Sequence, residues 1–383
     1  MKLSHVVGAR PNFVKAAPVI RALENIPEVE QRIIHTGQHY DPAMSDNIIR
    51  DVGMREPDIN LGIGSGTHAE QTAKAMMALE ADFVEHPPDM VLVYGDVNST
   101  LAGALAASKL NIPIAHVEAG LRSFDRTMPE EINRIIVDSI SDIHFVTSED
   151  AIENLVLEGI PRDNVFFVGN TMIDSIIFTE SRWRESDVVE RLGIGDGFVL
   201  VTLHRPSNVD DPDRLAQIVN QLDRISQSSK LVFPVHPRTR EKFESAGLTS
   251  SDQLTLIEPV PYFDAISLMS QASVVITDSG GVQEETTFLG TPCLTVRDST
   301  ERPITLTMGT NRLVEVHLLE EESLAAGVRA GEDSPAARRS AGRAGERISK
   351  FLLAFTTGAA VNFSSINGEP VRPEYLLQVG KAW

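Results

Sequence analysis

The chain has 383 residues with 54 acidic and 34 basic side chains, a formal charge of −20, and this length suggests two domains or one large one. The acidic balance argues against a nucleic-acid or anionic-membrane binder, because phosphate affinity comes mainly from clustered Lys and Arg. The single cysteine, Cys293, excludes an internal disulfide framework and a cysteine-based zinc site.

The first half of the chain alternates short β-branched runs with longer amphipathic stretches. This order predicts parallel strands separated by helices, and therefore a doubly wound sheet. The strands are expected at residues 3–8, 31–35, 90–95, 113–117, 142–146 and 164–168, and the helices at 15–24, 70–84, 99–109, 130–139 and 149–157. Two helix starts carry capping-box signatures, one formed by Thr67 and Glu70 and the other by Thr127 and Glu130.

The same pattern then starts again without any repeat at the level of residues. Strands are expected at 198–202, 230–235, 254–257, 273–277 and 293–296, and helices at 212–225, 262–269 and 282–289. We expect two Rossmann-like α/β/α domains, 1–175 and 176–355, that face each other across a cleft. Residues 356–383 form a C-terminal tail for which the sequence predicts no role.

No membrane segment is apparent in the sequence. No apolar run approaches the roughly 18–20 residues that span a bilayer. Residues 1–8 lead directly into a strand pattern and lack the long hydrophobic region of a signal peptide. We therefore expect a soluble, cytoplasmic protein.

Two cations follow the first predicted strand, in the sequence Gly8-Ala9-Arg10-Pro11-Asn12-Phe13-Val14-Lys15. This segment lacks the spaced glycines of a phosphate-binding fingerprint. It still places Arg10 and Lys15 at a strand-to-helix turn, where they could meet an anionic ligand. The alternative is a helix-start loop with solvated cations.

A glycine-containing turn, Asp278-Ser279-Gly280-Gly281, follows the strand at 273–277 and opens a helix. Its glycines allow close backbone approach, and free N–H groups at a helix start can bind phosphate. Ser279, Gly280 and Gly281 are thus candidates for phosphate binding, and Glu285 for a ribose diol. The alternative is a simple turn whose acidic residues offset the helix dipole. Arg302 is a further loop cation.

Three acids follow strands of the first half or open its helices: Asp96, Glu118 and Glu131. Carboxylates gathered in a partly desolvated cleft can act as general acid or base. Each also has a structural alternative. Asp96 would be an N-cap, Glu118 an ion-pair partner of Arg122, and Glu131 a first-turn dipole partner.

Two histidines follow strands of the second half. His204, beside Arg205, is a candidate for catalysis, whereas His236 is better suited to ligand binding. The sequence contains no recognisable metal-binding motif. The acidic run at 210–213 lacks the later Gly and Glu of a calcium loop and is better explained as the start of a helix. The sequence predicts no metal and no cofactor.

Taken together, these motifs closely resemble the non-hydrolysing UDP-N-acetylglucosamine 2-epimerases. The resemblance covers about residues 1–320. The motifs occur in this order: Gly8-Ala9-Arg10-Pro11 with Lys15, Thr36-Gly37-Gln38-His39, Gly95-Asp96, His116-Val117-Glu118-Ala119-Gly120-Leu121-Arg122, Pro129-Glu130-Glu131-Ile132-Asn133-Arg134, Val168-Gly169-Asn170-Thr171, His204-Arg205, Asp278-Ser279-Gly280-Gly281-Val282-Gln283-Glu284-Glu285 and Thr300-Glu301-Arg302-Pro303.

The resemblance implies a GT-B fold and interconversion of UDP-GlcNAc and UDP-ManNAc, by elimination of UDP to 2-acetamidoglucal and re-addition. It implies a site for the diphosphate, with Glu285 at the ribose and residues 258–265, including Val260, at the uracil. The diphosphate residues would be Arg10, Lys15, Ser279, Gly280, Gly281 and Arg302. The acid/base groups would be Asp96, Glu118, Glu131 and His204.

The resemblance also implies a homodimer and a second, activating UDP-GlcNAc site, for which Gln38, Arg205 and His236 are the candidates. Two departures from the family pattern bear on specificity and activation. Pro206-Ser207-Asn208 follows the His-Arg pair in place of an acidic residue and Asn, and Ile304 replaces a frequent Glu. A hydrolysing 2-epimerase and a 2-epimerase of diacetamido uronic acids are the alternatives.

Overall fold

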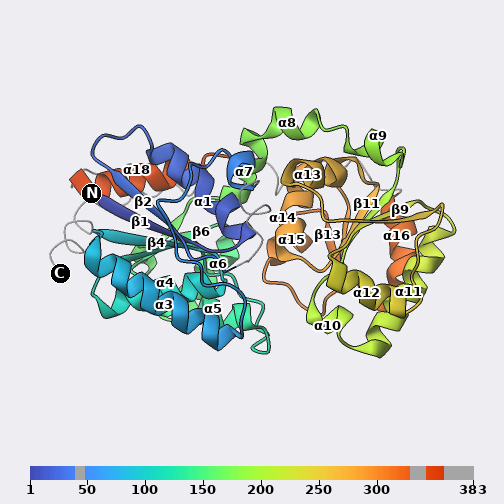
Figure 1. Ribbon diagram of the computed structural model, residues 1–383, viewed down its shortest axis with the longest axis horizontal. Coiled ribbons are helices and arrows are strands. Elements are labelled where there is room, and N and C mark those ends of the chain that lie inside the picture. The colour runs from blue at the N-terminus through green and yellow to red at the C-terminus, as the bar shows by residue number, and fades with distance from the viewer. Residues whose placement is uncertain (39–47, 328–341, 358–383) are drawn as a thin grey trace. The chain divides into compact units, whose positions relative to one another are not determined.

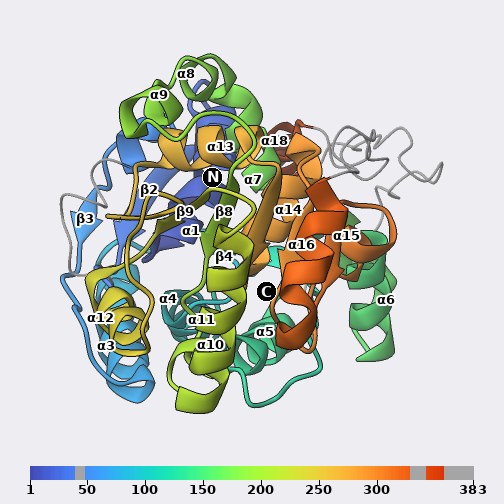
Figure 2. The same ribbon diagram turned by 90° about the vertical axis from the view of Figure 1, so that its right-hand side faces the viewer.

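The computed structural model describes residues 1–38, 48–327 and 342–357, which form two compact units. Among the described residues, unit 1 comprises 1–38, 48–178 and 342–357, and unit 2 comprises 179–327. Each unit holds a parallel sheet with helices packed around it (Figures 1 and 2). The predicted α/β class is therefore confirmed.

The sheet of unit 1 has seven parallel strands in the order β3-β2-β1-β4-β5-β6-β7. They are β1 (Lys2–Val7), β2 (Glu30–His35), β3 (Ile59–Asn60), β4 (Met90–Tyr94), β5 (Ile114–Ala119), β6 (Ile143–Val146) and β7 (Val165–Phe167). All six predicted strands are present, and every residue of β4 is buried, as expected for a strand covered on both faces. The two-residue β3 was not predicted because it is too short to form a pattern.

The helices of unit 1 are α1 (Arg10–Leu23), α3 (His68–Glu85), α4 (Asn98–Lys109), α5 (Pro129–Ile140), α6 (Glu149–Leu157), α7 (Thr171–Phe178) and α18 (Ala344–Thr357), with a 3₁₀ turn at Arg162–Asn164. The start of α1 lies five residues before the predicted one. Pro11 suits the first turn of a helix, and the Asn12 side chain accepts hydrogen bonds from the backbone N–H groups of Gly8 and Ala9, both at 3.1 Å.

One of the two predicted capping boxes is confirmed and the other is wrong. Glu70 N donates to Thr67 Oγ1 at 3.2 Å, and Thr67 N donates to Glu70 Oε2 at 3.0 Å. The N-cap of α5 is instead Met128. The hydroxyl of Thr127 donates to Asp125 Oδ1 at 2.6 Å, so a local Asp turn uses the side chain that the box requires.

The sheet of unit 2 has six parallel strands in the order β10-β9-β8-β11-β12-β13. They are β8 (Val199–Thr202), β9 (Leu231–Pro234), β10 (Leu254–Ile257), β11 (Val274–Thr277), β12 (Cys293–Thr295) and β13 (Asn311–Leu313), of which only β13 was not predicted. The helices are α8 (Glu180–Arg184), α9 (Val188–Leu192), α10 (Pro206–Val209), α11 (Pro212–Ser226), α12 (Pro237–Ser245), α13 (Tyr262–Gln271), α14 (Gly280–Leu289), α15 (Pro303–Thr307) and α16 (Leu319–Gly327), with a 3₁₀ turn at Val316–Leu318.

The assignment of residues 342–355 to the second domain is wrong, because α18 packs on α1 and α7 of unit 1 (Figure 1). Gly345 lies against Pro18, where a Cβ atom would be 2.5 Å from the Pro18 carbonyl oxygen. The N–H of Gly345 donates to Asp174 Oδ2 at 2.8 Å, so α7 caps the start of α18. Of the predicted tail, residues 358–383 lie outside the described part of the chain.

Each sheet has one point where the strand order reverses, between β1 and β4 in unit 1 and between β8 and β11 in unit 2. Ligands of open α/β sheets bind at such switch points, beyond the carboxyl ends of the strands. Arg10, Lys15 and Asp96 follow the two switch-point strands of unit 1, and His204, Arg205 and the turn Ser279-Gly280-Gly281 follow those of unit 2, whereas the other candidates lie in or after neighbouring strands. Across the described residues, no helix is long and apolar enough to cross a membrane.

Candidate functional site

A buried ion pair lies at the switch point of unit 1. Lys15 is in the second turn of α1 rather than at the strand-to-helix turn predicted for it, and its Nζ lies 2.8 Å from Glu118 Oε1. The two side chains are 5% and 1% exposed. Gly95, with φ of +62°, makes room for this lysine, since a Cβ there would lie 2.6 Å from Nζ. Pairing of Glu118 with Arg122, the alternative considered above, is wrong.

The backbone at Glu118 is unusual for a strand. Its φ is +73°, and the register of β5 against β6 shifts between Val117 and Ala119. Glu118 is thus the extra residue of a β-bulge and adopts the left-handed conformation, which costs a residue other than glycine about 1–2 kcal/mol. Such conformations persist where surrounding contacts fix them, and they cluster at functional sites.

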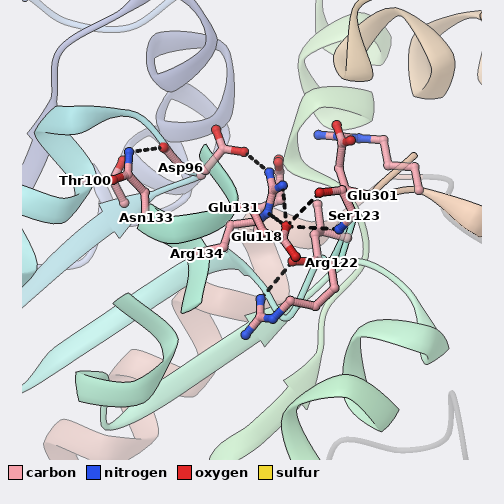
Figure 3. A network of polar contacts seen from close by, with 12 residues as sticks. Asp96, Thr100, Glu118, Arg122, Ser123, Glu131, Asn133, Arg134 and Glu301 are labelled. Atoms are coloured by element: carbon pink, nitrogen blue, oxygen red, sulfur yellow. Dashed lines mark hydrogen bonds and ion pairs between the residues drawn. The ribbon is translucent and has the colours of Figure 1, made fainter. Parts of the chain in front are cut away.

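A second charged cluster joins the other two candidate acids through one arginine (Figure 3). Arg134, fully buried in α5, ion-pairs with Asp96 after β4, and its Nη2 lies 2.6 Å from Glu131 Oε2. Asn133 Nδ2 also donates to the backbone carbonyl of Asp96 at 2.8 Å. Asp96 is not the N-cap of α4, which is Val97.

Glu131 has more than one donor. Besides Arg134, it accepts hydrogen bonds from Ser123 N, Ser123 Oγ and Phe124 N at 2.9–3.0 Å. Burial acts to raise the pKa of Glu131, but these hydrogen bonds and the Arg134 charge outweigh it and hold the pKa below its ordinary value. Glu131 is therefore an anchored carboxylate rather than a solvated first-turn acid.

The two remaining candidates of unit 1 lie at the same edge of its sheet. Arg10 is the half-buried first residue of α1. Gln38 follows β2, and its Oε1 accepts hydrogen bonds from Ser99 N at 3.2 Å and Ser99 Oγ at 2.7 Å, at the start of α4.

In unit 2, His204 and the turn after β11 meet at a buried aspartate. Asp278 is fully buried, and its Oδ1 lies 3.1 Å from His204 Nδ1. It also accepts backbone N–H donors from His204 at 3.0 Å and Arg205 at 2.9 Å. Burial acts to raise the pKa of Asp278, but the interactions with His204, Arg205 and Asn208 together lower it. The His204 side chain is 62% exposed, and the buried Asp278 fixes the orientation of its ring.

Arg302 packs over the glycine turn of unit 2. Its Nε lies 2.8 Å from Glu284 Oε2, and its guanidinium also ion-pairs with Glu301. A Cβ at Gly280 would lie 2.4 Å from Arg302 Nη1, so glycine is needed there for packing as well as for backbone access. Ser279 is the N-cap of α14, Gly281 lies in its first turn, and Glu285 is buried further along it.

Two candidate residues of unit 2 lie outside these clusters. Val260 is half-buried between β10 and α13, and His236 is an exposed N-cap residue at the start of α12. In the described ranges of the chain, no group of three or more His, Cys, Asp or Glu side chains is arranged to hold a metal ion.

Two residues that organise these clusters, Arg134 and Asp278, were not predicted from the sequence as site residues. A signal existed for each. Arg134 lies three residues after Glu131 on a helix, which is the spacing of an ion pair. Asp278 ends a buried strand and has no charged neighbour in sequence to pair with.

The fold and these two switch-point clusters define a GT-B-type sugar-nucleotide enzyme. The family described as UDP-N-acetylglucosamine 2-epimerase matches residues 21–353. A curated UDP-N-acetylglucosamine 2-epimerase of Methanocaldococcus jannaschii is 44% identical over 324 residues, covering 82% of this chain and 88% of the relative. The chain therefore belongs to the UDP-N-acetylglucosamine 2-epimerase family.

Other comparisons agree with this membership. The UDP-2,3-diacetamido-2,3-dideoxy-D-glucuronate 2-epimerase of Pseudomonas aeruginosa is 46% identical over 319 residues, covering 82% of this chain and 88% of the relative. The crystal structure of the M. jannaschii UDP-GlcNAc 2-epimerase in complex with UDP-GlcNAc and UDP is similar with a TM-score of 0.83 and 41% identity, covering 92% of this chain and 99% of that one.

Proposed function

We propose that this chain epimerises a UDP-linked 2-acetamido sugar at C2, with UDP-GlcNAc and UDP-ManNAc as the interconverting pair. The observation that carries this proposal is the set of three carboxylates at one edge of the unit 1 sheet, each held by a buried cation. Membership in the 2-epimerase family supports it.

The chemistry accounts for such a site. The C2 proton of the sugar is not acidified by a carbonyl group, so direct removal and return would be very slow. Elimination of UDP across C1–C2 gives 2-acetamidoglucal, and re-addition of UDP with the proton on the opposite face inverts C2. The enzyme must therefore stabilise a departing diphosphate and supply acid/base groups near C2.

Asp96, Glu118 and Glu131 are the proposed acid/base groups, with His204 near the leaving phosphate or the reacting carbon. Lys15 links the two tasks. Its ammonium donates a hydrogen bond to Glu118, so a diphosphate that attracts Lys15 would weaken this bond and make the Glu118 carboxylate more basic as it exchanges a proton.

The remaining assignments follow the family resemblance. The diphosphate would be bound by Arg10, Lys15, Ser279, Gly280, Gly281 and Arg302, the ribose by Glu285 and the uracil by the segment that contains Val260. Arg302 already has two carboxylate partners, Glu284 and Glu301, and these would hold the guanidinium in position for phosphate.

A homodimer and a second, activating UDP-GlcNAc site at Gln38, Arg205 and His236 complete the proposal. Sedimentation would test the dimer. Activation predicts that the initial rate rises more steeply than hyperbolically with UDP-GlcNAc, and that His236→Ala restores a hyperbolic curve.

A UDP-2,3-diacetamido uronate is the second candidate substrate, because the P. aeruginosa enzyme of that specificity matches at 46% identity. Offering both UDP-sugars to the purified chain and following products by NMR separates the candidates. We expect UDP-ManNAc from UDP-GlcNAc. If only the uronate is converted, the second candidate is the substrate. Accumulation of UDP with free ManNAc would indicate a hydrolysing enzyme.

A further inference from the structure

A histidine and an aspartate form an ion pair beneath the acids of unit 1. His116 in β5 and Asp138 in α5 are both completely buried. His116 Nδ1 lies 2.6 Å from Asp138 Oδ1, and its Nε2 lies 2.8 Å from the backbone carbonyl oxygen of Gly95. None of the roles proposed above uses either residue.

The partners of His116 determine its protonation state. A carbonyl oxygen can only accept a hydrogen bond, so Nε2 must carry a hydrogen. A carboxylate also only accepts, so Nδ1 must carry one as well. The ring is therefore an imidazolium, and Asp138 is its counterion.

The surroundings balance these charges. Arg122 Nη1 lies 2.7 Å from Asp138 Oδ2, and Arg122 Nη2 lies 2.6 Å from Glu158 Oε2, which gives two cations and two anions. His144 also faces the group, through a 2.8 Å hydrogen bond from its Nε2 to the Asp138 backbone carbonyl. A buried imidazolium is tolerated because it is paired and fully hydrogen-bonded.

The pair touches each segment that carries a candidate acid. The imidazolium binds the carbonyl of Gly95, the residue before Asp96. Asp138 Oδ2 accepts the N–H of Gly120, two residues after Glu118, at 3.1 Å. Asp138 itself lies two turns after Glu131 in α5.

We propose that the His116–Asp138 ion pair is a positioning device for the C2 chemistry, in which the doubly hydrogen-bonded imidazolium fixes the turns that aim Asp96 and Glu118. The effect of this ion pair on catalysis rests on the proposed function, whereas the charge state of His116 does not depend on it. Neither residue touches the substrate, so both act through the turns that they hold.

Asp138→Asn removes the negative charge of the side chain but keeps its size and shape. The Asn oxygen still accepts from Arg122 and Gly120, while its NH₂ group donates to Nδ1 and converts His116 to the neutral Nε2–H form. We expect kcat to fall about 10-fold to 10²-fold, with KM and the Kd for UDP changed less than about twofold. Asp142→Asn is the control, because Asp142 accepts the N–H of Ile114 at the opposite end of β5; its kcat should be unchanged.

The charge state is read directly by ¹⁵N NMR of the histidine rings at pH 8, where an ordinary imidazole is neutral, with His116→Gln used for assignment. We expect both ring nitrogens of His116 to be protonated in the wild type and one in Asp138→Asn. A singly protonated wild-type ring overturns the proposal even if Asp138→Asn fails to fold. An unchanged kcat in folded Asp138→Asn overturns the positioning role. If the wild type shows no epimerase activity, the proposed function fails but the NMR result for the His116 ring still tests the charge state. The two failures are therefore distinguishable.

Discussion

The switch points of the two units hold their polar residues in different ways. In unit 1, Glu118 and Glu131 are buried and paired with Lys15 and Arg134. In unit 2, His204 is largely exposed and is fixed by Asp278 beneath it. Unit 1 thus presents carboxylates that are already oriented, whereas unit 2 offers backbone N–H groups and an accessible histidine. This difference agrees with the roles proposed above, proton transfer at carbon for unit 1 and nucleotide binding for unit 2.

Removal of an acid from unit 1 should have the largest effect on activity. Glu131→Gln removes an anchored carboxylate, and we expect kcat to fall about 10²-fold to 10⁴-fold, as for loss of a general acid or base. UDP affinity, measured by calorimetry, should remain within about threefold. Glu130→Gln, one residue earlier on the same helix, is the matched control. A parallel loss of UDP affinity would reassign Glu131 to ligand binding.

The buried pair of unit 1 should also show in stability. Lys15→Met removes the buried ammonium that pairs with Glu118 Oε1, and breaking a buried ion pair from one side should cost about 3–5 kcal/mol of unfolding free energy. Chemical denaturation measures the loss, and the double variant Lys15→Met/Glu118→Gln should recover a large part of it. If the double variant is no more stable than Lys15→Met, the pair is not the cause.

The exposed histidine of unit 2 should behave in the opposite way. His204→Ala should lower kcat about 10²-fold but change the unfolding free energy by less than about 0.5 kcal/mol. Asp278 keeps its backbone donors from residues 204 and 205 and the Asn208 side chain in this variant. A large loss of stability would show that His204 is structural and would remove the contrast with unit 1.

A buried histidine of unit 1, His5, should show in the pH dependence of stability rather than in activity. Burial lowers the pKa of His5 to about 3, and its Nδ1 lies 2.6 Å from the Tyr94 hydroxyl. Between pH 6.5 and 3 the unfolded chain binds a proton at this residue that the folded chain does not, so stability falls as pH falls. In His5→Asn the pH dependence of the unfolding free energy should be shallower by one proton. An identical slope in both proteins would contradict the assignment.

The sequence predicted the fold well because both sheets are built from buried, nearly continuous apolar strands, as in β4. It failed at β3 and β13, which are too short to show a pattern. It also misplaced α18, whose docking on α1 depends on Asp174 and Gly345, contacts between residues far apart in the chain.

The candidate site was predicted at the level of residue types and strand ends. The partners were not, since they depend on which strands become neighbours. Glu118 follows β5 and Lys15 lies in α1, and only the parallel arrangement of β1, β4 and β5 brings them together. The left-handed backbone of Glu118 had no sequence signal, because a glycine and not a glutamate marks such a conformation.

Deuterium incorporation at C2 is the most direct test of the central claim, that the acids of unit 1 exchange the C2 proton. UDP-GlcNAc is incubated in D₂O with the wild type or Glu118→Gln, and the C2 position is followed by proton NMR. We expect exchange at C2 together with UDP-ManNAc formation in the wild type, and loss of both in a Glu118→Gln variant that still binds UDP. UDP-ManNAc formed without deuterium at C2, or undiminished exchange in Glu118→Gln, would contradict it.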